Sequence, residues 1–165
     1  MLTLKPLSVE SIPGALAKAE RYRLLHEPVQ AESICEDILQ IQPDNQQALV
    51  MLLLAITDRF DKELAVGKAR ALLTRLQSDY DRSYYEGIIS ERVGHARLGQ
   101  GGPGSGTKAY ESFREAMICY ERAEDLRPAG NDDSVLRWNT CARFLNSHQH
   151  LEPQPEDRLE PLLLE

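Results

Sequence analysis

The sequence has few aromatic residues and no long apolar run, and each shortage excludes a class of protein. Aromatic residues make up 6% of the 165 residues, and valine and isoleucine are sparse beside alanine, leucine and glutamate. This balance favours helices over β-sheets. The longest apolar run, residues 48–56 (ALVMLLLAI), is about half as long as the ~20 residues of a membrane-spanning helix. We therefore expect a buried helix there, no association with a membrane, and one all-α domain.

Cysteine is also scarce, and negative charge exceeds positive charge. The three cysteines, Cys35, Cys119 and Cys141, form no C-x-x-C unit. The first ten residues (MLTLKPLSVE) lack the apolar run of a signal peptide, so we expect a cytoplasmic protein whose thiols are reduced and packed as small apolar side chains. The net charge of −7, without a cluster of Lys and Arg, argues against a nucleic-acid partner.

Residues 101–109 (GGPGSGTKA) come close to the phosphate-binding pattern G-x-x-x-x-G-K-[ST]. That pattern requires a buried strand before the glycines and a helix that opens at its lysine. The preceding residues 90–100 (SERVGHARLGQ) instead have a charged, helical pattern, and Lys108 falls one position late. We interpret the stretch as a flexible connection between two helices. A nucleotide-binding loop at Gly101–Lys108 is kept as a remote alternative.

Other patterns typical of catalysis or metal binding are missing from the sequence. His148 and His150 are close to each other but have no third ligand at a suitable spacing, so we expect no metal. No pair of carboxylates stands in an apolar setting, and no G-x-S-x-G motif is present. We therefore expect a protein that is not an enzyme, with no catalytic residue and no cofactor.

A repeat runs through most of the chain. Residues 31–43 (AESICEDILQIQP) align with residues 116–128 (AMICYERAEDLRP), 85 residues later, which is two periods of 34 residues and 17 residues more. A middle copy starts at Ala65 and has Ala69 and Leu72 in the matching places. The extra residues must fall between Ser90 and Ala116, where the Gly-rich stretch also lies. We expect them to form a long insertion near residues 99–108.

These segments resemble the tetratricopeptide repeat (TPR), a helix–turn–helix unit with W-x2-L-G-x2-Y in its first helix and A-x3-F in its second, followed by proline. Ala116, Tyr120 and Pro128 give the strongest match, and residues 138–145 (WNTCARFL) resemble the capping helix of such arrays. The resemblance implies a short right-handed superhelical stack of three helical hairpins and a C-terminal capping helix.

The expected boundaries follow the repeat. The hairpins are expected at about 12–45, 46–79 and 80–130, the capping helix at about 132–147, and an N-terminal extension at 1–11. Residues 148–165 form an acidic tail with prolines, which we expect to be mostly flexible. Whether its leucines 162–164 bind to a surface of this or another molecule stays open.

The residue types agree with pairs of helices whose backbones lie close together. Small side chains let two antiparallel helices approach closely, and they stand at Ala19, Ala31, Ala65, Gly87, Ala116 and Ala123. Pro28 is expected to open one helix, and the stretches QPDN (42–45) and RPAGND (127–132) are expected to end one helix and cap the next.

The resemblance also implies a function. In such proteins the first helices of successive repeats line a concave groove that holds a peptide or helix of a partner. In this chain the groove would be lined by Leu16, Glu20, Arg23, Leu24, Val50, Met51, Leu54, Asp58, Tyr84, Tyr85, Ile88, Glu91, Arg92, Asn139 and Arg143. Leu16, Val50 and Ile88 could instead pack in the core, and the adjacent Tyr84 and Tyr85 cannot both face the groove.

We therefore predict a non-catalytic protein-binding module that acts as an adaptor, scaffold or small chaperone. The lysine and asparagine pairs of the family's carboxylate-binding grooves are missing, so an apolar peptide or helix is the expected ligand. The alternative is a self-assembling, homo-oligomeric structural protein.

Overall fold

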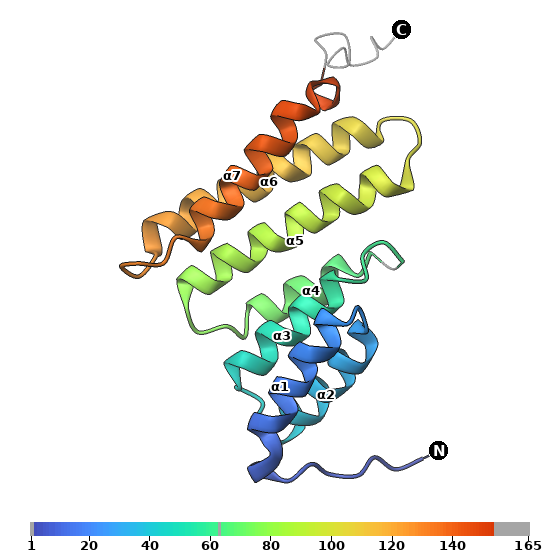
Figure 1. The fold of residues 1–165 in the computed structure, drawn as a ribbon, viewed down its shortest axis with the longest axis vertical. Helices are drawn as coiled ribbons and strands as arrows, with labels where there is room; N and C mark the ends of the chain where they lie inside the picture. The colour runs from blue at the N-terminus through green and yellow to red at the C-terminus, as the bar shows by residue number, and fades with distance from the viewer. Residues whose placement is uncertain (1, 63, 154–165) are drawn as a thin grey trace, which may run out of the picture.

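The computed structural model describes residues 2–62 and 64–153, which fold into seven α-helices joined by turns (Figure 1). The helices are α1 (Ile12–Leu24), α2 (Pro28–Ile41), α3 (Gln46–Thr57), α4 (Val66–Leu73), α5 (Asp79–Gln100), α6 (Ser105–Leu126) and α7 (Asp133–Ser147). The short 3-10 helices η1 (Val9–Ser11) and η2 (Gln149–Leu151) precede α1 and follow α7. This part of the chain contains no strand, so the predicted all-α class is confirmed.

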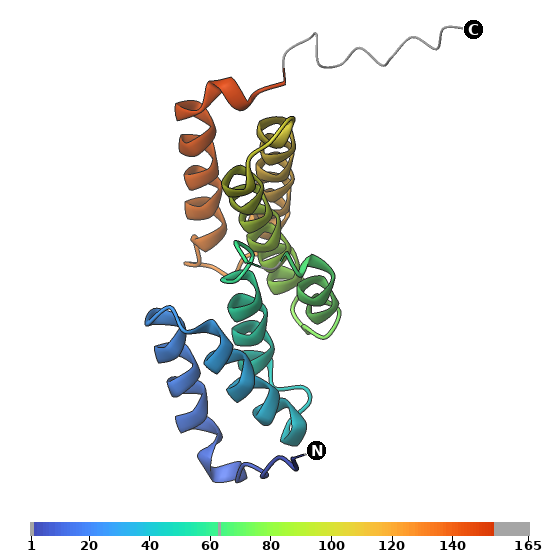
Figure 2. The ribbon, with the colours of Figure 1, turned by 90° about the vertical axis from the view of Figure 1, so that its right-hand side faces the viewer.

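Each helix packs against the next one along the chain, from α1 through to α7. In Figures 1 and 2, α1 to α4 form one end of an elongated molecule, and the longer helices α5, α6 and α7 form the other. One core cluster is built around Leu49, Leu53 and Phe60, and another around Phe113 and Tyr120. Leu54 and Tyr85 pack against both clusters, so the apolar interior continues from one end to the other.

The helix ends carry the signals expected from the sequence. Pro28 is the first residue of α2, where its missing N–H leaves no helical hydrogen bond unmade. Asn45 caps α3, because its Oδ1 accepts a hydrogen bond of 2.9 Å from the backbone N–H of Ala48. Ser78 caps α5 in the same way through the N–H of Asp81. Asn131, next to the start of α7, accepts from the N–H of Asp133.

The positions related by the repeat are core positions. In the second helix of each pair, most of the aligned side chains are buried: Ala31, Cys35 and Ile38 in α2, Ala69 and Leu72 in α4, and Ala116, Tyr120 and Ala123 in α6. The exception is Ala65, which precedes α4 and is half-buried. In the first helix of each pair, Ala19, Leu53 and Gly87 are buried. The period read from the sequence therefore follows the packing of the helices.

Gly87 shows why a small residue is needed where α5 and α6 meet. A Cβ built at Gly87 would lie 2.5 Å from Cε1 of Tyr120. The Tyr120 ring occupies the space of the missing side chain, so the two helices come closer there than a larger residue would allow. Two turns further along α5, a Cβ built at Gly94 would lie 3.0 Å from the ring of Phe113.

The prediction of a long Gly-rich insertion is wrong, because the turn is short. Helix α5 continues to Gln100 and α6 begins at Ser105, so only residues 101–104 form the turn. Both helices contain 22 residues, whereas α1 to α4 contain 13, 14, 12 and 8. The extra residues of the third pair therefore lengthen its two helices. Gly101, Gly102 and Gly104 have φ values of 66°, 95° and 71°, which explains the glycines of the turn.

The predicted flexible tail falls largely outside the described residues. Residues 154–165, including the leucines at 162–164, are not described. Residues 148–153 are described, and η2 turns back so that Leu151 is buried against α6.

Candidate functional site

A groove of about 900 Å³ lies where the C-terminal ends of α1 and α3 meet the middle of α5. Helix α1 contributes Glu20, Arg23 and Leu24, the residues after α3 contribute Asp58, and α5 contributes Arg92. The first turn of α2, which includes Val29, borders the groove. These residues are distant in sequence and come together because the helices fold back on one another. We call this surface the three-helix groove.

Ion pairs fix the centre of the three-helix groove. Arg23 Nε donates to Asp58 Oδ2 at 2.7 Å, and Arg92 Nη1 lies 3.2 Å from Asp58 Oδ1. The side chains of Arg23 and Asp58 are each 19% exposed, so the arrangement is partly shielded from water. One carboxylate thus holds two guanidinium groups from different helices, and the three side chains are positioned before any ligand arrives.

A second hollow of about 450 Å³ continues the three-helix groove along α5. The two share Asp58, Asp61 and Arg92, and the second adds Phe60, Ala96 and Gly99. It exists because α5 is longer than α3 and projects beyond the end of that helix (Figure 1). The lengthening of the third pair therefore extends the surface that a ligand could contact.

The structure brings together five of the predicted groove residues: Glu20, Arg23, Leu24, Asp58 and Arg92 all line the three-helix groove. Leu24 is 76% exposed and supplies an apolar contact surface beside the ion pairs. The sequence placed these side chains on one face through the repeat, but the ion pairs among them were not foreseen.

Four other predicted residues are partly buried by packing. Leu16 packs against a smaller cluster around Ile38. Val50 and Met51 pack against the large cluster that contains Leu49, Leu53 and Phe60. Leu54 contacts both large clusters. These side chains therefore contribute more to the packing of the helices than to an exposed surface that a ligand could contact.

The prediction that Ile88 and Glu91 line an open groove is wrong. Ile88 is 2% exposed and Glu91 is 4% exposed. Glu91 accepts a hydrogen bond of 2.6 Å from the hydroxyl of Tyr120, and Arg137 of α7 lies 3.2 Å from its other oxygen. Helix α7 places this arginine over the carboxylate, so Glu91 becomes an internal link among α5, α6 and α7.

Tyr84 takes part in the same internal contacts. Its ring lies 5.7 Å from that of Tyr80 and 5.8 Å from that of Tyr120. It also interacts with Arg137 of α7, while burial raises the pKa of its hydroxyl. Tyr84 is therefore mainly an aromatic support for α7. Tyr85 packs against both core clusters.

Asn139 and Arg143 lie on α7 and do not line the three-helix groove near Asp58. Helix α7 packs mainly against α6, at the end of the molecule distant from α1 and α2 (Figure 1). The structure therefore does not bring these two residues together with the predicted residues of the first and second pairs.

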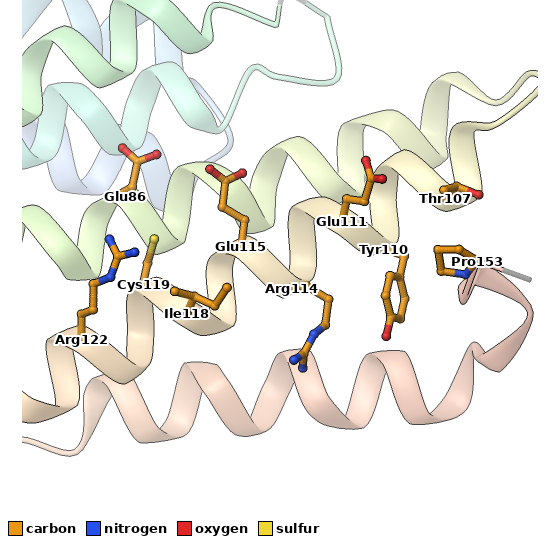
Figure 3. Close-up of a pocket in the computed structure, with 10 residues that line it drawn as sticks. All are labelled: Glu86, Thr107, Tyr110, Glu111, Arg114, Glu115, Ile118, Cys119, Arg122 and Pro153. Carbon is orange, nitrogen blue, oxygen red and sulfur yellow. The ribbon is translucent and has the colours of Figure 1, made fainter. Parts of the chain in front are cut away.

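Sequence reasoning missed a second groove, on the outward side of α6 (Figure 3). It has a volume of about 710 Å³ and includes Tyr110, Arg114, Ile118 and Arg122, spaced four residues apart along the helix. Ile118 is 45% exposed although it stands in an otherwise polar row. That exposed apolar residue on the face opposite the buried stripe is the signal from which the groove could have been inferred. We call this surface the α6 groove.

The cysteines are free and buried, as predicted. Burial raises the pKa of Cys35 to about 12, of Cys119 to about 11 and of Cys141 to about 12. The thiols are therefore protonated at neutral pH, which disfavours nucleophilic chemistry. Within residues 2–62 and 64–153, histidine, cysteine and carboxylate side chains nowhere gather in a group of three that could hold a metal ion.

Over residues 2–62 and 64–153 the fold is all-helical, and the three-helix groove and the α6 groove are both of mixed apolar and charged character. No protein-family model matches the chain, and no curated protein or solved structure matches it either. Among the helices of the described residues, none combines the length and the apolar character that crossing a membrane requires.

Proposed function

We propose that the chain is a TPR-like helical repeat protein whose three-helix groove binds an apolar segment of a protein partner. Successive packing of α1 with α2, α3 with α4 and α5 with α6 supports the repeat interpretation, as does the burial of the positions related by the repeat. Stacked helix pairs of this kind form extended surfaces that bind other chains.

The observation that carries the proposal is the convergence of three helices on one preformed groove. Arg23, Asp58 and Arg92 are held by mutual ion pairs, so little freedom is lost when a ligand orders them. Beside them Leu24 and Val29 are 76% and 55% exposed. Apolar area next to fixed polar groups is the composition of a specific protein-binding surface.

Affinity purification with the full chain tests the proposal. Leu24→Glu combined with Arg92→Glu alters the three-helix groove at exposed or half-exposed side chains, so the fold should be retained. Leu136→Glu is the matched control, because Leu136 is 61% exposed on α7. We expect at least one protein to be captured by the wild type and the control and lost with the double variant. Equal capture by all three chains would refute the assignment of the groove.

Self-assembly is a second candidate, because the outer face of the first helix pair carries a hollow with half-buried apolar residues among Glu10, Lys18 and Asp37. This hollow of about 500 Å³ is lined by Leu7, Gly14, Ala15 and Ile34, among others. The first unit of a helical array usually has a polar outer face, so the apolar part of this hollow favours stacking with a second copy. Native mass spectrometry across concentrations tests this candidate, and a strictly monomeric chain would exclude it.

A further inference from the structure

The α6 groove has an apolar centre between two positive charges. Ile118 is 45% exposed and stands four residues from both Arg114 and Arg122, so all three lie along one side of α6. Tyr110 continues the row toward the start of the helix (Figure 3). A ligand that fits this row would have an apolar middle with acidic groups near it.

The positive charges of the two arginines in the α6 groove are available to a ligand. Among the described residues, neither Arg114 nor Arg122 forms an ion pair. Two of the three acidic residues that line the groove are already engaged, since Arg70 lies 2.7 Å from Glu86 and 3.3 Å from Glu115. The third, Glu111, is exposed and stands one turn before Arg114 and Glu115, toward the start of α6. The groove can therefore accept a carboxylate at either end of the apolar centre.

The described chain after α7 returns to α6 and ends at this groove. Leu151 of η2 is 5% exposed, and its Cδ2 would lie 3.2 Å from a Cβ at Gly106 of α6. Two residues later, Pro153 itself lines the groove, beside Thr107 and Tyr110 (Figure 3). The described chain thus ends beside the groove, at the N-terminal end of α6.

We propose that the α6 groove binds residues 154–165 (QPEDRLEPLLLE) of the same chain, with leucines 162–164 against Ile118. Glu160 and Glu165 flank these leucines and match the charges of Arg114 and Arg122. This inference concerns a different face from the three-helix groove and does not depend on the function proposed there.

The available length of chain permits this contact. Ile118 lies eleven residues beyond Thr107, or ~17 Å along the helix at ~1.5 Å per residue. The leucines follow Pro153 by nine to eleven residues, which span up to ~30 Å when extended. Because the segment is tethered at the groove, its effective concentration is in the millimolar range, and a weak contact suffices to keep it bound.

Site-specific photo-crosslinking in the full chain tests the proposal. With Leu163→p-benzoylphenylalanine, we expect crosslinks to residues 110–122 within a single chain, located by mass spectrometry. The same photoreactive residue at Leu4, which is 70% exposed at the other end of the chain, is the matched control and should not crosslink to α6. Crosslinks between two copies, crosslinks elsewhere, or none at all would each overturn the proposal.

A second measurement separates binding in the groove from chance proximity. Reversing both arginines, Arg114→Glu with Arg122→Glu, changes exposed side chains and should lower the crosslinking yield about threefold, as expected for surface ion pairs. In the otherwise unchanged chain, replacing leucines 162–164 by serine should increase alkylation of Cys119, which lines the groove, while Cys35 and Cys141 stay unchanged. An unchanged yield together with an unchanged rate at Cys119 would refute the contact.

Discussion

Replacing Gly87 by alanine tests whether the close approach of α5 and α6 is what the repeat encodes. The new Cβ would lie 2.5 Å from Cε1 and 2.7 Å from Cδ1 of Tyr120. Carbon atoms in contact normally lie about 3.5–4.0 Å apart, so the ring would have to move by about 1 Å. Tyr120 cannot move freely, because it is fully buried and its hydroxyl is bonded to Glu91 at 2.6 Å.

The expected loss follows from two opposing effects. Forcing an extra carbon into a packed core costs about 1–3 kcal/mol. Alanine is favoured over glycine inside a helix by about 1 kcal/mol. Because the clash is with a ring held on all sides, we expect the steric effect to prevail and the free energy of unfolding to fall by about 1–2 kcal/mol.

Urea unfolding followed by circular dichroism measures this loss. Gly67→Ala is the matched control, since Gly67 is also helical and a Cβ there meets nothing within 4 Å. We expect the control to be as stable as the wild type or up to about 1 kcal/mol more stable. If Gly87→Ala were equally stable, the argument that Tyr120 requires a glycine opposite it would be refuted.

Three further outcomes are expected. Glu91→Gln should lower the free energy of unfolding by about 2 kcal/mol, because it removes the negative charge that both Tyr120 and Arg137 contact. A variant as stable as the wild type in urea would contradict the role of Glu91 as an internal link. Asp58→Ala should lower it by less than about 1 kcal/mol, since its two ion pairs are partly solvated, and a loss above about 2 kcal/mol would show them to be a main source of stability. Burial raises the pKa values of the three thiols above the ~8.5 of an unfolded chain. The stabilisation from keeping these thiols protonated is therefore complete below about pH 8.5 and is lost as the pH rises toward 11–12. Each thiol lowers the free energy of unfolding by about 1.4 kcal/mol per pH unit in that range. Cys35→Ala should reduce this decline between about pH 8 and pH 10 in urea titrations, and an undiminished decline would rule out Cys35 as its source.

The candidate site was predictable only in part. The repeat placed Arg23, Leu24 and Asp58 on one face, because side chains at equivalent positions of stacked helices point the same way. It also placed Glu91 there, yet Tyr120 and Arg137 enclose that carboxylate. A repeat gives the direction of a side chain relative to its own helix, and it does not say which later helix covers it.

The Gly-rich turn was likewise predictable only in part. The sequence showed a surplus in the third helix pair and a helical pattern over residues 90–100, but the glycines and proline of residues 101–106 did not show where the next helix begins. The structure places the surplus in α5 and α6, and the projecting part of α5 creates the second hollow beside Arg92.

The sequence by itself determined the helical class, the period of the helix pairs, the burial of the cysteines and the need for a small residue at Gly87, because these depend on composition and on regular spacing along one helix. The tertiary structure alone decided which charges pair across α1, α3 and α5, which side chains α7 covers, and where the chain leaves Pro153 beside the α6 groove. These depend on the lengths of neighbouring helices and on the angles at which they pack, which no local pattern encodes.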